Sequence, residues 1–417
     1  MSDDAPPATT ETPLRVLFVA PYYKPNWGGI ERVIDQLSAH LRASGHTTGM
    51  LATHYAFPRR HLSGLAARET IDGGMDYHRV PSWPHRAPPF FSVPLVWFPP
   101  RAFAAVVDEF RPDVIHWVGD GWFWGHLWTW VYGRHHATVV FTPSFHRLIP
   151  AYRWLQPINI LLCRAADRIT VLSGLERKAL LRTYLAPRAR LTTIGWGIDA
   201  PASDGTPPQG WQPDRLTLLC VGRLGAHKGQ EWTLDRLLAA RARLPQEVAA
   251  RLRLVLVGRD EGSEAALRAR IARAGLADLV LLTGEVDDAE LLRWYDHADL
   301  FVLFSHYEAF GLALVEALAH GLPAITHAVG ATAEIVPDGC GAIVVPPFDA
   351  AAAENALVAL LGNERARVAL GRAGRAFAAR YAWPQVTQRF VAVYRQARAR
   401  GARRRGDETN KANRKAH

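Results

Sequence analysis

Short apolar segments that alternate with amphipathic segments run through this 417-residue sequence and restrict the folds open to it. The stretch LRVLFVAPYY (14–23) is apolar, rich in β-branched residues and ends in a turn, which is typical of a buried parallel strand. After KPNWGG, apolar residues recur at helical spacing from Ile30 to Leu41, Gly45 ends the helix, and TTGMLATHY returns as a strand. This order predicts a βαβ unit.

The alternation continues in two blocks, which are separated by the Gly-, Pro- and Ser-rich stretch GWGIDAPASDGTPPQGWQP (195–213). The first block adds the helix RAFAAVVDEF, the strands PDVIHWVG, ATVVFTPSFH and ADRITVLS, and the helix GLERKALLRTYL. The second holds the strands LTLLCVGRL, RLRLVLVGRD, LVLLTGE, ADLFVLFS, PAITHAVG and GAIVVPP. The pattern therefore predicts an α/β protein with two doubly wound parallel sheets, which fits roughly 100–200 residues per domain.

The net charge of +10 is concentrated at the C-terminus. The segment 395–417 holds nine Lys and Arg against two Asp and Glu, and its few apolar residues predict a solvated, disordered tail. Attraction to an anionic membrane or polyanion is the alternative, because each such cation contributes about 1 kcal/mol near an anionic surface.

Several classes of protein are not expected from this sequence. No run of 18 apolar residues predicts a membrane span, and the acidic, Pro-rich start MSDDAPPATTETP is unlike a signal peptide. The three separated cysteines, Cys163, Cys220 and Cys340, suggest neither disulfides nor a metal cluster but buried thiols in a reducing, cytoplasmic setting.

Candidate ligand-binding residues follow the strands, because ligands of open parallel sheets sit beyond the carboxyl ends of the strands. Gly28 and Gly29 follow the first strand, without the further residues of a P-loop or dinucleotide fingerprint. Arg223 and Lys228 follow LTLLCVGRL and suit a diphosphate, since Arg offers a fork of donors and Lys a point charge. A solvated charged loop is the alternative for this pair.

The stretch SHYEAFGLALVEALAHGLPAITHAVG (305–330) carries two glutamates in apolar surroundings. Glu308 is predicted in the loop at a strand end, and Glu316 in a helix that starts near Gly311 and stops at Gly321. The amides at the start of this helix offer an anion site. A buried Glu316 would need a partner such as ribose hydroxyls, whereas the alternative is a solvent-facing helix glutamate.

With these motifs, the chain resembles the retaining glycosyltransferases of family 4. The resemblance rests on the Gly-Gly loop, VGRLGAHKG (221–229), the stretch 284–336 and the closing YAW…VYR, and it covers roughly residues 14–398. It implies the GT-B fold, in which two Rossmann-like domains face a cleft and a C-terminal helix crosses back to the N-terminal domain. The expected division is a tail (1–13), an acceptor domain (14–200), a nucleotide-sugar domain (201–382), the crossover helix (383–398) and a basic disordered tail (399–417).

The resemblance also implies roles by position. Glu308 would contact the donor sugar and take part in catalysis, His146 would contact the sugar on the acceptor side, and Glu316 would hold the ribose. The remaining positions divide between the diphosphate (Gly29, Arg223, Lys228, Phe310, Gly311, Leu312) and the nucleobase (Arg259, Glu285, Val286). A hydrogen-bonded structural residue is the alternative for His146, and His116 competes with it but is expected in the core.

A tryptophan-rich stretch, WVGDGWFWGHLWTWVY (117–132), holds five of the fourteen tryptophans. Trp124 and Trp128 lie at helical spacing, so core packing is the expectation. Stacking on an acceptor sugar or contact with a membrane interface is the alternative.

The expected function is retaining transfer of a hexose from a nucleoside-diphosphate sugar to a glycan or lipid-linked acceptor in cell-surface polysaccharide or glycolipid synthesis. No cofactor and no metal are expected, because the cations neutralise the leaving diphosphate and no Asp-x-Asp motif occurs. A cytoplasmic location is expected, with peripheral contact to the inner membrane face through the tail as an option, and nucleic acid is not an expected partner. A sugar-nucleotide epimerase and a non-catalytic nucleotide or polyanion binder are the rival functions.

Overall fold

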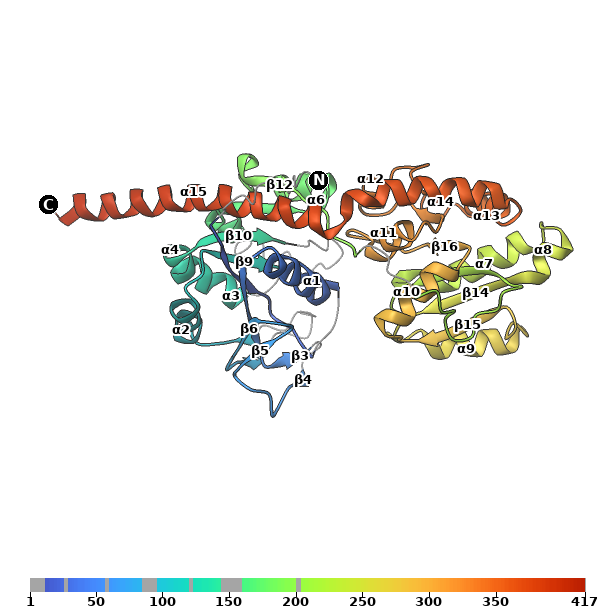
Figure 1. Cartoon of the computed structure of the whole chain (residues 1–417), viewed down its shortest axis with the longest axis horizontal. Helices are drawn as coiled ribbons and strands as arrows, with labels where there is room; N and C mark the ends of the chain where they lie inside the picture. The colour runs from blue at the N-terminus through green and yellow to red at the C-terminus, as the bar shows by residue number, and fades with distance from the viewer. Residues whose placement is uncertain are drawn as a thin grey trace, which may run out of the picture. The chain divides into compact units, whose positions relative to one another are not determined.

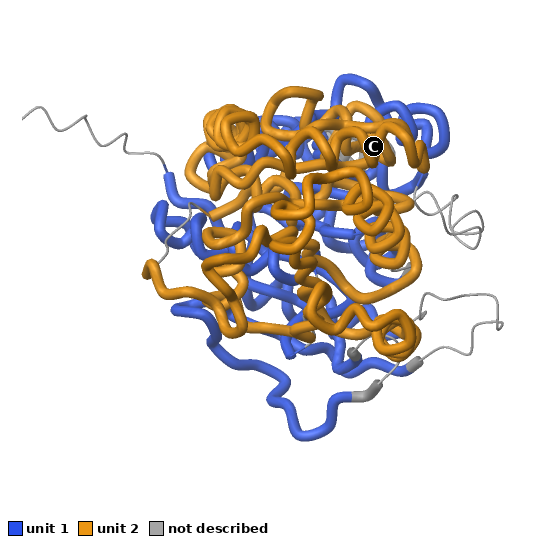
Figure 2. Tube along the Cα trace, turned by 90° about the vertical axis from the view of Figure 1, so that its right-hand side faces the viewer, with its two compact units in different colours: residues 1–171, 177–194, 387–417 blue, residues 172–176, 195–386 orange. Residues whose placement is uncertain are grey.

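The computed structural model describes residues 12–25, 29–56, 60–84, 96–119, 123–143, 160–199 and 204–416. Within them the chain forms two compact units (Figure 2). Unit 1 comprises residues 1–171, 177–194 and 387–417, and unit 2 comprises residues 172–176 and 195–386. The chain thus passes to unit 2 at Gly195, six residues before the expected boundary at residue 201, and the expected tail 1–13 lies almost wholly outside the described residues.

Unit 1 is built on an eight-stranded sheet with the order β12-β11-β10-β9-β1-β2-β6-β5. All neighbours pair in parallel except β5, which is antiparallel to β6. The strands are β1 (Arg15–Val19), β2 (Thr47–Thr53), β5 (Arg68–Ile71), β6 (Met75–Val80), β9 (Val114–Val118), β10 (Thr138–Thr142), β11 (Arg168–Val171) and β12 (Leu191–Thr193). The predicted strands of this block are confirmed, whereas β5, β6 and β12 are absent from the predicted pattern.

The first two helices of unit 1 each bury an apolar face. In α1 (Gly29–Ala43) the buried apolar residues are those at the predicted helical spacing. The other helical segments are α2 (Pro100–Phe110), α3 (Phe123–Trp128), a π-helical turn (Thr129–Gly133), α4 (Arg134–His136) and α6 (Gly174–Thr183). Short strand pairs complete the unit: β3 (Tyr55–Ala56) with β4 (Arg60–His61), and β7 (Trp83–Pro84) with β8 (Val96–Trp97).

Unit 2 has a fully parallel six-stranded sheet with the order β15-β14-β13-β16-β17-β18. Its strands are β13 (Leu216–Val221), β14 (Leu252–Val257), β15 (Val280–Gly284), β16 (Leu300–Leu303), β17 (Ala324–His327) and β18 (Ala342–Val345). The helices are α7 (Gln230–Arg241), α8 (Gln246–Arg251), α9 (Glu264–Arg273), α10 (Asp288–His297), α11 (Leu312–Ala319), α12 (Thr332–Ile335), α13 (Ala350–Leu361) and α14 (Glu364–Ala378). The six strands predicted for this block are confirmed.

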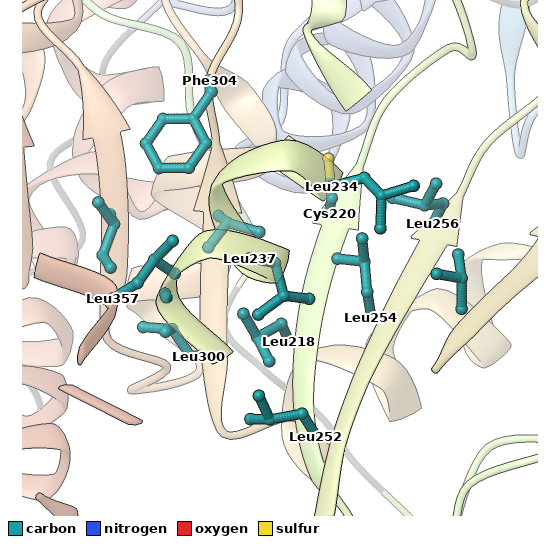
Figure 3. Packing of buried hydrophobic residues seen from close by; sticks show 14 of the residues in the cluster. Leu218, Cys220, Leu234, Leu237, Leu252, Leu254, Leu256, Leu300, Phe304 and Leu357 are labelled. Carbon is teal, nitrogen blue, oxygen red and sulfur yellow. The ribbon is translucent and has the colours of Figure 1, made fainter. Parts of the chain in front are cut away.

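Leucine-rich strands and helices form the core of unit 2. Leu234 and Leu237 of α7 meet Leu218 of β13 and Leu254 of β14, and all four are fully buried (Figure 3). Burying one such side chain contributes about 1.5–3 kcal/mol. The packed helices therefore hold the sheet rigidly, and the sheet in turn fixes the positions of the loops at the strand ends.

The last helix, α15 (Trp383–Ala416), begins in unit 2 and continues as part of unit 1 (Figure 1). The hydroxyl of Tyr394 lies 2.8 Å from Nδ1 of the buried His116 of β9, and the guanidinium of Arg404 is 3.1 Å from the carboxylate of Asp167. The crossover of the chain to unit 1 is thus confirmed. Residues 399–416, expected as a disordered tail, continue the helix instead, and Arg404 ties the first part of this segment to Asp167.

The Gly-rich stretch that opens unit 2 packs tightly. A Cβ on Gly195 would lie 2.7 Å from the Phe310 ring, and one on Gly197 would lie 2.3 Å from the Trp383 ring. Both positions therefore require glycine for space, and residues 195–199 belong to the packed structure of unit 2.

Candidate active site

The candidate donor site lies at the carboxyl edge of the unit 2 sheet, where the strand order reverses. From β13 the chain builds outward through β14 and β15, and then returns to the other side of β13 with β16. The loops after the neighbouring strands β13 and β16 therefore diverge from each other. Open α/β sheets bind ligands in the crevice at such a point. Arg223 and Lys228 are in the first of these loops and Glu308 is in the second.

The structure brings Lys228 and Glu308 into direct contact. The ammonium Nζ of Lys228 lies 2.7 Å from Oε1 of Glu308, and the Ser305 hydroxyl donates to the same oxygen over 2.7 Å. The Glu308 side chain is only 11% exposed. A carboxylate this buried is stabilised by both donors, so its oxygen is held in one place.

Close backbone contacts lock the two loops together. A 3-10 turn (Ala226–Lys228) ends at Gly229, where φ is +69° and a Cβ would lie 2.2 Å from the Phe304 carbonyl oxygen. The His306 amide donates to the His227 carbonyl over 2.8 Å. Glycine is thus required where the loop carrying Lys228 crosses the loop carrying Glu308.

The backbone behind Glu308 is held by the segment that follows β17. The Ala331 amide donates to the Glu308 carbonyl over 2.9 Å, and a Cβ on Gly330 would lie 2.0 Å from that carbonyl oxygen. Only the glycine in the segment AVGA (328–331) signals this contact in the sequence.

Arg223 faces a carboxylate from the loop after β14. Its guanidinium pairs with Glu261, and the two side chains are 46% and 36% exposed. Burial and the neighbouring Lys228 lower the pKa of His227 in the same loop, so this ring is neutral near pH 7.

Helix α11 begins and ends where the sequence predicts. Gly311 is its N-cap with φ of +83°, and Gly321 follows its end with φ of +76°. Phe310 is buried, with its ring 5.5 Å from that of Tyr381, whereas Leu312 is partly exposed. The amides of the first turn of a helix have no acceptor within it, so this N-terminus can bind an anion.

Glu316 is half-buried on α11, and its carboxylate accepts a hydrogen bond from the Tyr295 hydroxyl over 3.0 Å. Tyr295 is a buried residue of α10, and its ring also contacts His320. Sequence reasoning missed this partner. Tyr295 directly follows Trp294 in LLRWYDH, and two adjacent buried aromatic residues on an amphipathic helix are the available signal.

The expected nucleobase residues follow β14 and β15. Arg259 and Glu285 are exposed, and Val286 is partly exposed. The Arg259 carbonyl accepts from the Leu224 amide over 2.8 Å, which joins the loops after β14 and β13. These residues therefore lie at the same sheet edge, one and two strands from the strand reversal.

The site residues expected in unit 1 are only partly described. Gly29 is exposed at the first position of α1, after β1, and a Cβ there would have nothing within 4 Å. Its neighbour Gly28 and the expected sugar-contacting His146 lie outside the described residues.

His116 is a core residue, as expected. It is fully buried in β9 and lies 2.7 Å from the Thr142 hydroxyl, in addition to its bond with Tyr394, and burial lowers its pKa to about 3. Its ring is thus neutral and joins the sheet to the final helix.

The tryptophan-rich stretch packs on the core of unit 1. The rings of Trp124 and Trp128 stack with centroids 5.8 Å apart, and Trp128 donates to the Phe98 carbonyl over 3.0 Å. Both are partly buried against the apolar core that includes Trp117. Core packing, the expected role, accounts for these three tryptophans.

Two other expectations concern cysteines and membranes. Cys163 and Cys220 are buried thiols, and Cys340 is partly exposed. Among the described residues, no helix has both the length and the apolar character required to cross a membrane.

Two sequence families match the chain, one for each half. Residues 27–200 match the family described as Glycosyltransferase Family 4, and residues 206–377 match Glycosyl transferases group 1. Each match covers most of one of the two Rossmann-like units. The chain belongs to the group 1 glycosyltransferases and is family 4-like in its N-terminal half.

Relatives of known name agree with this assignment. D-inositol 3-phosphate glycosyltransferase of Xylanimonas cellulosilytica is 32% identical over 57% of this chain and 58% of its own length, so the chain spans little more than half of this relative. GDP-mannose:cellobiosyl-diphosphopolyprenol alpha-mannosyltransferase of Xanthomonas campestris is 26% identical over 92% of this chain and 97% of its own length.

Among solved structures, sucrose-phosphate synthase from Thermosynechococcus elongatus has the same fold. Its TM-score is 0.72 at 22% identity, over 93% of this chain and 99% of that one.

Proposed function

We propose that this protein transfers a hexose from a nucleoside-diphosphate sugar to an acceptor hydroxyl with retention of anomeric configuration. The observation that carries the proposal is the pairing of Lys228 with Glu308 at the strand reversal of unit 2, beside the exposed Arg223. This arrangement offers two cations to a diphosphate and, within hydrogen-bonding reach of one of them, a fixed carboxylate for the sugar. The name of the Xanthomonas campestris relative, which specifies GDP-mannose, supports a nucleotide-sugar donor.

In the proposed reaction the bond between the anomeric carbon and the diphosphate breaks while the acceptor oxygen bonds to the same face of that carbon. The departing phosphate oxygen takes the proton of the acceptor hydroxyl. Arg223, Lys228 and the N-terminus of α11 (Phe310, Gly311 and Leu312) stabilise the charge that grows on the diphosphate. Glu308 orients and stabilises the sugar without bonding to it, and Glu316 holds the ribose.

The remaining expected residues keep their roles as proposals. The Gly29 amide binds the diphosphate, His146 contacts the sugar on the acceptor side, and Arg259, Glu285 and Val286 surround the base. No metal is needed in this scheme, because the two cations and the helix N-terminus carry the neutralising charge.

The acceptor is proposed to be a glycan or a lipid-linked sugar of cell-surface polysaccharide or glycolipid synthesis, at the cytoplasmic face of the membrane. The second relative acts, by its name, on a diphosphopolyprenol-linked cellobiose. Arg400 and Arg403 of α15 are exposed, and the helix is anchored through Arg404. These cations support contact with anionic lipid.

The donor can be identified by ligand-induced stabilisation and then by product analysis. We expect one of UDP, GDP and ADP to raise the melting temperature most, because a ligand at 100 times its Kd stabilises by about 2.7 kcal/mol. The matching sugar nucleotides are then supplied with and without acceptor, and the anomeric configuration of the product is read by NMR.

Transfer with retention supports the proposal. Conversion of the donor sugar into its epimer without acceptor would identify an epimerase instead, and nucleotide binding without turnover of any donor would identify a non-catalytic binder.

The membrane contact has a separate test. Vesicles with about one third anionic lipid should co-sediment the protein at low salt, and Arg400→Gln with Arg403→Gln should reduce the bound fraction. Equal binding to neutral vesicles would contradict an electrostatic contact.

A further inference from the structure

Both cations of the candidate donor site are paired with carboxylates of this chain. Lys228 contacts Glu308, and Arg223 contacts Glu261. Glu308 has the proposed role at the donor sugar, whereas nothing in the proposed reaction uses Glu261. Its second oxygen lies 3.8 Å from Nδ1 of His227, so this carboxylate lies near two residues of the loop that would bind a diphosphate.

The backbone holds Glu261 opposite Arg223. The Glu261 amide donates to the Leu224 carbonyl over 2.9 Å, and the Leu224 amide donates to the Arg259 carbonyl over 2.8 Å. The residues next to Arg223 and Glu261 are therefore joined in a short parallel bridge between the loops after β13 and β14.

The loop that carries Glu261 is itself rigid. Oδ1 of Asp260 accepts the amides of the next turn, those of Gly262, Ser263 and Glu264, over 2.8–3.0 Å. These bonds lower the pKa of the Asp260 carboxyl, which is thus ionised at neutral pH. The position of Glu261 is consequently set before any ligand arrives.

We propose that Glu261 is a resident counter-ion of Arg223 that a nucleoside diphosphate must displace, and that it weakens nucleotide binding in order to speed release of the product. This inference rests on the proposed donor class. Once the sugar has left and the phosphate has released the acceptor's proton to solvent, the diphosphate carries one more negative charge than the intact donor, so it binds the two cations more strongly. A carboxylate fixed beside Arg223 competes with that added charge and repels it, so Glu261 acts most strongly on the product.

The size of the effect follows from the exposure of the pair. An ion pair between side chains that are 46% and 36% exposed contributes little in water, so its loss should change affinity by about two- to fivefold. The direction of the change in nucleotide affinity is diagnostic. Loss of the charge of a residue that only maintains the fold would not raise the affinity.

The test compares Glu261→Gln with Glu264→Gln by titration calorimetry. Glu264 pairs with Arg268 over 2.7 Å within α9, so its replacement removes the same charge three residues away without touching Arg223. The probes are UDP, GDP, ADP and inorganic pyrophosphate, at low and high salt, with melting temperatures as a check on folding.

We expect Glu261→Gln to bind the preferred nucleoside diphosphate about two- to fivefold more tightly, and Glu264→Gln to bind it as the unaltered protein does. The gain should shrink at high salt and in an Arg223→Gln background. Unchanged binding in Glu261→Gln would overturn the inference, and so would weaker binding, which would make Glu261 a direct nucleotide contact. If the unaltered protein binds none of the three nucleotides, the proposed function falls and this inference falls with it.

Discussion

The Lys228 ammonium lies 2.7 Å from the Glu308 carboxylate, although the two residues are 80 positions apart in the chain. They meet because β13 and β16 are neighbours at the strand reversal of the unit 2 sheet. One ion pair thereby joins a proposed diphosphate cation to the proposed sugar-binding carboxylate. Changes at this pair should separate binding from turnover.

Glu308→Gln should lower kcat by about 100-fold or more, because it removes the charge proposed to stabilise the donor sugar in the transition state. Nucleoside diphosphate affinity should stay the same or rise slightly, since Lys228 loses its carboxylate. Steady-state kinetics and calorimetry measure the two effects, with Glu354→Gln, which breaks the 2.6 Å pair with Arg236, as the control. Full activity in Glu308→Gln would remove this residue from the mechanism.

Gly330→Ala should reduce activity and stability more than the same substitution does in an ordinary turn. The added Cβ would lie 2.0 Å from the Glu308 carbonyl oxygen, so the loop must move, and φ is +54°. Gly339→Ala is the matched control, because its φ is +78° with nothing within 4 Å. The control should lose about 1–2 kcal/mol of unfolding free energy and keep its activity. Equal stability and activity losses in the two variants would contradict the packing of Gly330 against Glu308.

Tyr295→Phe should weaken nucleoside diphosphate binding by about fivefold, because the lost hydrogen bond to Glu316, worth about 1 kcal/mol, orients the proposed ribose-binding carboxylate. Tyr132→Phe is the control in unit 1, where it removes a 2.6 Å bond to Asp108. Calorimetry with the preferred nucleotide distinguishes the two. An unchanged affinity in Tyr295→Phe would mean that Glu316 is not positioned by this bond.

His126 should make the protein sensitive to acid. It is 2% exposed, neither ring nitrogen has a hydrogen-bond partner among the described residues, and burial lowers its pKa to about 3. Between pH 6.5 and pH 3 the unfolded chain takes up a proton that the folded chain excludes, so the unfolding free energy falls as pH falls, by up to about 1.4 kcal/mol per pH unit. Above pH 6.5 this histidine adds no pH dependence.

His126→Leu should remove that part of the acid sensitivity and leave stability at pH 8 unchanged or higher, since an unpaired buried polar group is replaced by an apolar one. Denaturant unfolding at pH 5 and pH 8 measures the difference. His135→Gln, at an exposed position, is the control. Identical pH slopes in His126→Leu and the unaltered protein would show that His126 is protonated alike in the folded and unfolded states.

Chelation should leave the transferase reaction intact, because Arg223, Lys228 and the α11 N-terminus are proposed to neutralise the diphosphate. Turnover of the identified donor in EDTA should equal turnover in Mg²⁺ within about twofold, in line with electrostatic stabilisation by fixed groups. An activity lost in EDTA and restored by Mg²⁺ would contradict the metal-free scheme.

The sequence pattern predicted most of the fold, and it predicted candidate residues at the ends of the correct strands. Apolar runs such as LTLLCVGRL become strands wherever they can be buried on both faces, and Gly311 and Gly321 bracket a helix because each adopts a positive φ. It did not predict β5, β6 and β12, and it placed residues 399–416 in a disordered tail. β5 is ordered by its hairpin with β6, β6 by its pairing with β2, and Arg404 by its ion pair with Asp167, which is distant in sequence.

Residue order by itself determined that Arg223, Lys228 and Glu308 follow parallel strands, and parallel strands end at one edge of their sheet. Only the tertiary structure decided their partners: Glu308 for Lys228, Glu261 for Arg223 and Tyr295 for Glu316. Strand order sets which loops become neighbours, and it depends on how all the helices bury their apolar faces together. The local spacing of residues does not encode the strand order. The positions of the charged residues were therefore predictable, and their partners were not.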